Sequence, residues 1–142
     1  MGAWGAGSLE NDTAEAWLAE LKQAEADGGA PGLLGDAIEP LADPALGLID
    51  ADEASRAVAA AEIVAALLGR PGAALPQPVL AWLGRHEAAF GGAARALQPT
   101  ALATLSRVKT ASELRAFWDA NDNLAAFEAA IDELHERLRA AG

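Results

Sequence analysis

The stretch from Ala57 to Leu68 constrains the fold most, because its twelve residues are apolar except for one carboxylate, Glu62. Alanine and leucine dominate the stretch, which favours a helix over a buried strand. A helix that is apolar on every side lies in the interior of a protein. At about 1.5 Å per residue the stretch spans roughly 18 Å, which is too short to cross a bilayer. We therefore predict a buried central helix at about residues 51–69.

The rest of the composition favours an all-α protein. Tyrosine is absent and β-branched residues are few, whereas sheets are rich in β-branched and aromatic residues. The chain has 142 residues and no cysteine, so one domain without disulfides is expected. We predict a single compact domain over residues 1–142, with about six or seven helices around the central one. The N-terminus shows no secretory signal, which together with the missing cysteines predicts a cytoplasmic protein.

Capping residues and breakers place the other helices. Asp12 and Glu15 have capping-box spacing, and Gly28–Gly29 ends the helix that they open. Further capping pairs are Asp50 with Glu53, before the central helix, and Thr110 with Glu113. Two further helices are predicted to start near Pro31 and Pro76, and another to cover roughly residues 99–109. A regular apolar seam from Leu124 to Ala141 predicts the last helix.

The N-terminal segment, residues 1–11, is rich in glycine and contains one large side chain, Trp4. An exposed indole gains little free energy, so we expect Trp4 to dock into the core. Glycines would let this backbone run close against a helix. The prediction is a glycine-rich segment docked on the helical domain.

The net charge of −11 is confined to the first third of the chain. Residues 1–53 hold twelve carboxylates and one base, whereas residues 54–142 hold nine of each. Such a field repels nucleic acid and attracts a basic partner. The alternative is that these charges only keep the protein in solution. The candidate acidic docking face consists of Glu15, Glu20, Glu25, Asp27, Asp36, Glu39 and Asp43.

Glu62 is the residue whose chemistry most needs an explanation. A carboxylate in an apolar helix must be neutral, paired or hydrogen-bonded. One reading is a buried acid at a functional site. The structural reading, which we favour, is a carboxylate that accepts backbone N–H groups or pairs with an arginine.

The sequence indicates no catalytic residues, no cofactor and no metal site. His86 and Glu87 match only half of a zinc-protease motif, since the second histidine is missing. Residues 119–130 begin like a calcium loop but lack its glycine and its last glutamate. No phosphate-binding glycine loop and no Ser-His-Asp signature is present.

The opening MGAWGAGSLENDTAEAWLAEL resembles an uncharacterised bacterial family, domain of unknown function 4259. The similarity rests on a Met-Gly-x-Trp-Gly-x-Gly start, on Glu-Asn-Asp at residues 10–12, and on residues 61–65 and 112–115. It covers nearly the whole chain, although Leu9 stands where an aromatic is usual. The resemblance assigns no function. It implies that Trp4, Asn11, Asp12 and Glu62 belong to one local arrangement.

Two functions of different classes remain open at this point. The first is a non-enzymatic protein that binds a basic protein through its acidic first third, as immunity proteins and antitoxins do; that comparison rests on charge alone. It would bind neither nucleic acid nor membrane. The alternative is a small hydrolase or ligand-binding enzyme that uses Glu62 with Asp12 and His86 in one pocket.

Overall fold

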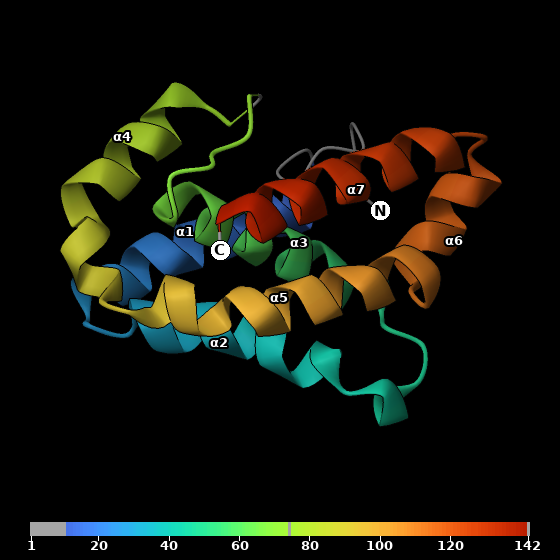
Figure 1. The fold of residues 1–142 in the computed structure, drawn as a ribbon, viewed down its shortest axis with the longest axis horizontal. Helices are drawn as coiled ribbons and strands as arrows, with labels where there is room; N and C mark the ends of the chain where they lie inside the picture. The colour runs from blue at the N-terminus through green and yellow to red at the C-terminus, as the bar shows by residue number, and fades with distance from the viewer. Residues whose placement is uncertain (1–10, 74, 142) are drawn as a thin grey trace.

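The structure is a computed structural model that describes residues 11–73 and 75–141. Within that part the chain is helical, with seven α-helices and three 3₁₀-helices (Figure 1). The α-helices are α1 (Asp12–Ala26), α2 (Ala30–Ile38), α3 (Ala51–Leu67), α4 (Gln77–His86), α5 (Ala93–Thr110), α6 (Glu113–Ala120) and α7 (Leu124–Ala141). The 3₁₀-helices are η1 (Glu39–Ala42), η2 (Pro44–Leu46) and η3 (Glu87–Phe90). The predicted all-α class is confirmed.

Helix α3 is the central element of the molecule. It contacts all six of the other α-helices, and Figure 1 shows it in the middle of the bundle, behind α7. Residues 57–65 are all buried, and residues 66–68 are partly buried. Its alanines allow the neighbouring helices to approach closely, while Ile63 and Val64 fill the space between them. The predicted burial of this helix is confirmed.

Three capping predictions meet different outcomes. Asp50 caps α3 as predicted, since its side chain accepts from the backbone N–H groups of Asp52 and Glu53. The caps of α1 and α6 were placed wrongly, because Asn11 caps α1 and Ser112 caps α6. Each site offers two capping residues close together, Asn11 beside Asp12 and Thr110 two residues before Ser112, so spacing alone selects the wrong member. Thr110 instead ends α5 and donates to the carbonyl of Ser106.

Helix α5 begins six residues before the predicted start at Pro99. Proline inside a helix removes one backbone hydrogen bond and costs about 3 kcal/mol. Here Pro99 is exposed, and Ala94 and Leu97 on the turns before it are buried in the core. Packing of this first segment against the core offsets the cost of the proline, so the helix continues through it.

The last helix closes the bundle as its seam predicts. Phe127, Ile131, Leu134 and Leu138 are buried, and α7 packs on α3, α5 and α6. Between α6 and α7, Asp122 adopts a φ of 56°, and the N–H of Asn123 donates to the carbonyl of Trp118. No helix in the described ranges is both long and apolar enough to cross a membrane.

Candidate functional site

Glu62 is buried on α3 and forms a bidentate pair with Arg137 of α7. Arg137 Nη1 donates to Glu62 Oε2 at 2.6 Å, and Nη2 donates to Oε1 at 2.8 Å. The two side chains are 6% and 16% exposed, so the pair is largely shielded from water. Bidentate, charge-assisted hydrogen bonds of this kind are the strong ones in proteins. The pair therefore joins the central helix to the last one.

The same pair holds the loop that follows α3. Arg137 Nη1 also donates to the carbonyl of Arg70 at 2.9 Å, and the N–H of Gly72 donates to Glu62 Oε2 at 3.1 Å. A Cβ on residue 72 would lie 2.9 Å from Glu62 Oε1 and 3.1 Å from Arg137 Nη2. A Cβ at residue 72 would therefore push the two members of the ion pair out of place, which favours glycine there.

Glu133 completes the surroundings of the guanidinium from one turn earlier on α7. Its Oε1 accepts from Arg137 Nη2 at 2.9 Å, and its Oε2 accepts from Nε. The hydrogen bonds from Arg137 to Glu62 raise the pKa of the guanidinium above its ordinary value, and those to Glu133 add to them, while burial opposes both. Glu62, Gly72, Glu133 and Arg137 are called the Glu62 cluster below.

The geometry of the Glu62 cluster is that of a structural lock. Glu62 accepts three hydrogen bonds, two from a guanidinium and one from a backbone N–H. Both carboxylate oxygens are therefore already engaged by Arg137 or by the loop backbone. This contact pattern supports the structural reading of Glu62.

The other members of the family-implied arrangement are placed as follows. Trp4 lies outside the described residues. Asn11 is buried, and its Oδ1 accepts from the N–H of Ala14 at 2.7 Å, so its polar side chain is used as a helix cap. Asp12 is exposed in the first turn of α1. Within the described residues, no hydrogen bond joins Asn11 to Glu62 directly.

His86 belongs to a separate contact between α1 and α4. Its Nδ1 lies 3.0 Å from Glu25 Oε1, and its ring lies 5.2 Å from that of Trp82. Lys22 Nζ lies 6.0 Å from the Trp82 ring centre, a weak cation–π contact. The contacts of His86 and those of the Glu62 cluster share no residue. Across the described ranges, no three His, Cys, Asp or Glu side chains are placed to hold a metal ion.

Six of the seven acids proposed as a docking face are exposed, and Glu25 is the half-buried exception. These six form what is called the acidic surface below: Glu15, Glu20, Asp27, Asp36, Glu39 and Asp43. They lie on or next to α1, α2 and η1, which pack one against the next. No ion pair within the described chain involves any of them, whereas Glu25 pairs with His86.

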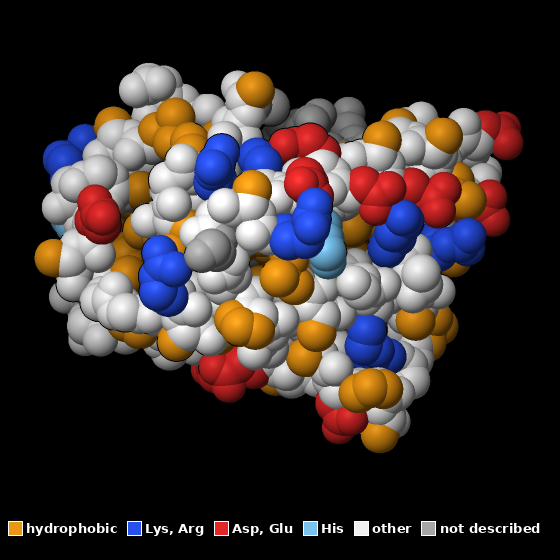
Figure 2. Space-filling view, viewed as in Figure 1, with side chains coloured by type: hydrophobic (Ala, Val, Ile, Leu, Met, Phe, Trp, Pro, Cys, Tyr) orange, Lys and Arg blue, Asp and Glu red, His pale blue; other side chains and the backbone are white. Residues whose placement is uncertain are grey.

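Three of the four acids of α7 behave differently. Asp132 pairs with Lys109, Glu133 with Arg137, and Glu136 with Arg139. Figure 2 shows the result on the face over α5, α6 and α7, where acidic and basic side chains alternate. The acids of the first third therefore outnumber the bases there, and within the described chain they also form fewer ion pairs than the acids of α7.

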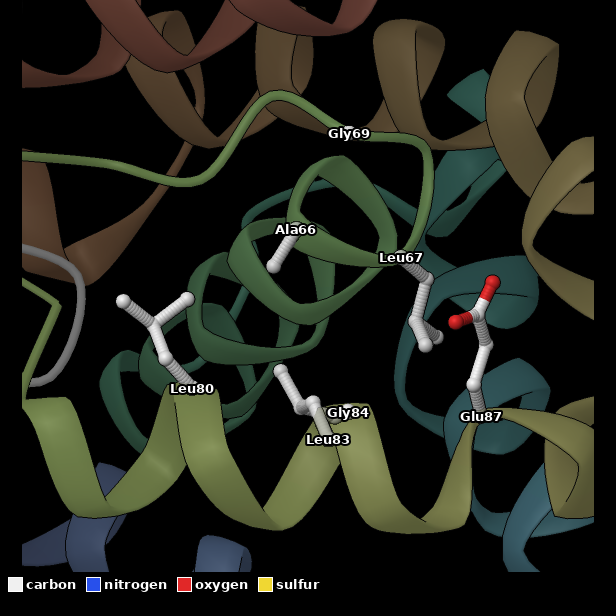
Figure 3. Close-up of a pocket in the computed structure, with 7 residues that line it drawn as sticks. All are labelled: Ala66, Leu67, Gly69, Leu80, Leu83, Gly84 and Glu87. Carbon is white, nitrogen blue, oxygen red and sulfur yellow. The ribbon is translucent and has the colours of Figure 1, made fainter.

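A cavity of about 220 Å³ lies between the end of α3 and α4 (Figure 3). Leu80 and Leu83 point from α4 toward α3, and the carboxylate of Glu87 lies beside Leu67 at one end. Ligand sites are larger than this and combine apolar walls with several convergent polar groups. Glu87 is the one charged side chain in this lining, so the cavity offers no set of groups for catalysis.

A family model, Domain of unknown function (DUF4259), matches residues 2–130. The chain belongs to this family. No curated protein and no solved structure matches it. Membership therefore places the chain among relatives whose function is unknown, and it leaves the chemistry to be argued from the residues themselves.

Sequence reasoning missed two features of the structure. Arg137 was not identified as the partner of Glu62, although an arginine was expected; its only local signal is Glu133, four residues earlier on the same helix. The exposure of Leu46 and Leu48 is the second feature: nothing in the sequence distinguishes them from core leucines, yet they are 48% and 67% exposed. Burial of a residue in a loop depends on what packs over it, which sequence alone does not show.

Proposed function

We propose that this chain is a non-enzymatic binding protein that docks a basic protein on its acidic surface. The observation that supports the proposal is the lack of ion pairs at that surface within the described chain. Paired charges on α7 largely cancel each other at a distance. Unpaired carboxylates on α1, α2 and η1 do not, so their potentials add up outside the protein.

Such a surface favours basic partners in a specific physical way. It accelerates encounter with a positively charged protein and fixes its orientation, while repelling acidic proteins and nucleic acids. The attraction falls as salt shortens the screening length, which is about 10 Å at 0.1 M ionic strength. The Glu62 cluster adds little to this potential, because Arg137 pairs with both of its carboxylates and leaves a single net negative charge.

The test compares two variants that carry the same change in net charge. The first neutralises the acidic surface with Glu15→Gln, Glu20→Gln, Asp36→Asn and Glu39→Gln. The control neutralises four exposed acids of the C-terminal part with Asp119→Asn, Asp122→Asn, Asp132→Asn and Glu136→Gln. Each immobilised protein is incubated with lysate of the source organism, and captured proteins are identified by mass spectrometry.

We expect the wild type and the control to retain the same proteins of high isoelectric point. The variant with a neutralised acidic surface should lose them, and high salt should release them from the wild type. Capture that persists after neutralisation of the acidic surface, or that ignores salt, would show that docking does not depend on these carboxylates.

A further inference from the structure

Leu46 and Leu48 are the two large hydrophobic side chains exposed in the described part of the chain, at 48% and 67%. Both lie in the loop of residues 43–48 between η1 and α3, called the knob loop below. Figure 1 shows this segment projecting from the bundle below α5. At the same corner in Figure 2, hydrophobic and acidic side chains lie next to each other.

The backbone of the knob loop is held firmly although its leucines are exposed. Arg107 of α5 donates through Nη1 to the carbonyl of Leu41 at 2.8 Å and through Nη2 to the carbonyl of Gly47. Asp43 accepts from the N–H of Ala45 at 2.9 Å, which caps η2. A loop fixed in this way loses little conformational entropy when it binds.

The far end of the knob loop is pinned as well. Ile49 is buried and forms a bridge with Ser112: its N–H donates to Ala111 at 2.9 Å, and its carbonyl accepts from Glu113 at 2.8 Å. Gly47 has φ 80° and ψ −145°, a conformation essentially restricted to glycine. The chain thus uses a special backbone conformation and an arginine clamp to present two leucines to solvent.

We propose that Leu46 and Leu48 are the apolar anchors of the docking surface and insert into an apolar pocket of a basic partner protein. This inference rests on the proposed function and adds the contact that would carry most of the binding energy. Interfaces depend on a few apolar side chains buried at their centre, while surrounding charges set encounter and orientation.

Charge identifies the occupant as a basic protein rather than a second copy of this chain. Residues 36–53 contain six carboxylates and no lysine or arginine. Two copies meeting at the knob loop would bring these like charges together, which costs free energy. A pocket rimmed by lysine or arginine would bury the leucines and neutralise Asp43 and Asp50 beside them.

The experiment uses a random peptide library displayed on phage, selected on the wild-type protein. Enriched peptides are synthesised, and their affinities are measured by calorimetry at low and high salt. Two variants address the knob loop: the double substitution Leu46→Ser/Leu48→Ser, and Gly47→Ala, which keeps both leucines and strains their presentation. The matched control replaces two exposed apolar side chains of α7, Ala125→Ser/Ala129→Ser. Circular dichroism verifies that each variant is folded.

The expected peptides combine lysine or arginine with bulky apolar residues. Their affinity should fall at least about tenfold for the leucine variant, should fall for Gly47→Ala, and should be unchanged for the α7 control. Peptides that bind the leucine variant as tightly as the wild type overturn the inference. So does a selection that enriches no peptide, or a concentration-dependent dimer that the leucine variant abolishes.

The outcomes also separate this inference from the proposed function. One result is basic peptides whose affinity requires the acidic surface but is the same for the leucine variant and the wild type. It would support the proposed function and show that the knob loop takes no part in it. The opposite result is apolar peptides whose affinity requires the two leucines but is unchanged by salt and by neutralising the acidic surface. It would support the leucines as anchors and exclude a basic partner.

Discussion

Replacing Glu62 by glutamine tests the lock between α3 and α7 with almost no change of shape. Oε2 of Glu62 accepts from both Gly72 and Arg137, while Oε1 accepts from Arg137 alone. The glutamine amide therefore keeps more hydrogen bonds when its oxygen takes the Oε2 position. Its NH₂ group then faces Arg137 Nη2, so two donors oppose each other and the guanidinium loses its buried counter-charge.

The magnitude follows from what Arg137 retains. Removing one partner of a fully buried ion pair costs about 3–5 kcal/mol. Here Arg137 is 16% exposed and keeps its bonds to Glu133 and to the carbonyl of Arg70, which lowers the cost. We expect Glu62→Gln to reduce the free energy of unfolding by about 2–3 kcal/mol. For a chain of this length that corresponds to a fall of roughly 6–10 °C in Tm.

The assay is urea unfolding followed by tryptophan fluorescence, since the chain has four tryptophans. Glu136→Gln is the matched control, because Glu136 pairs with Arg139 at the surface, where both side chains are more than 60% exposed. Exposed pairs contribute little, so the control should change stability by less than about 0.5 kcal/mol. Equal, small effects of the two substitutions would refute the lock.

A double substitution sharpens the same prediction. Arg137→Met leaves Glu62 buried without a cation and should be the more costly single change. Adding Glu62→Met removes that uncompensated charge, and replacing both members of a buried pair by apolar residues is often nearly neutral. The double variant should therefore be more stable than Arg137→Met alone. Additive losses would mean that the two side chains act independently.

Four further substitutions test the close approaches and local conformations. Gly72→Ala should destabilise the fold by about 1–3 kcal/mol, because its Cβ would lie 2.9 Å from a carboxylate oxygen. Gly32→Ala should stabilise the fold by up to about 1 kcal/mol, because Gly32 lies on a helix with open space around it. Asp122→Gly should stabilise by about 0.5–1 kcal/mol, since φ is 56° there. Ser55→Ala should stabilise by about 1 kcal/mol, because its buried hydroxyl has no hydrogen-bond partner within the described chain. Urea midpoints measure all four, and a sign opposite to the stated one counts against the corresponding contact.

The sequence predicts the central helix well because its signal is local. Residues 57–68 are apolar except for Glu62, and Asp50 caps the helix with a side chain three residues from Glu53. The seam of α7 is equally local. Pro99 misled the prediction of α5 because the reason for continuing the helix lies elsewhere, in the burial of Ala94 and Leu97 against other elements.

The partner of Glu62 illustrates what the sequence could not supply. A buried carboxylate requires compensation, so an arginine or backbone N–H groups were expected, and the structure provides both. Arg137 lies 75 positions away, among several other arginines with similar surroundings in the sequence. Only the packing of α7 across α3 selects it. Gly72 likewise looks like an ordinary loop glycine until the ion pair lies against it.

The positions of the acids relative to the helix ends separate two kinds of carboxylate. Negative charge stabilises the first turn of a helix and destabilises the last. Glu15 lies in the first turn of α1 and therefore contributes to folding. Asp27 lies at the C-terminal end of α1, and Asp36 lies in the last turn of α2; neither turn contains a base. Helix stability does not account for those two carboxylates, and no ion pair in the described chain compensates them. The proposed recognition of a basic protein would account for both observations at once, because a binding charge must be exposed and left unpaired until the partner arrives.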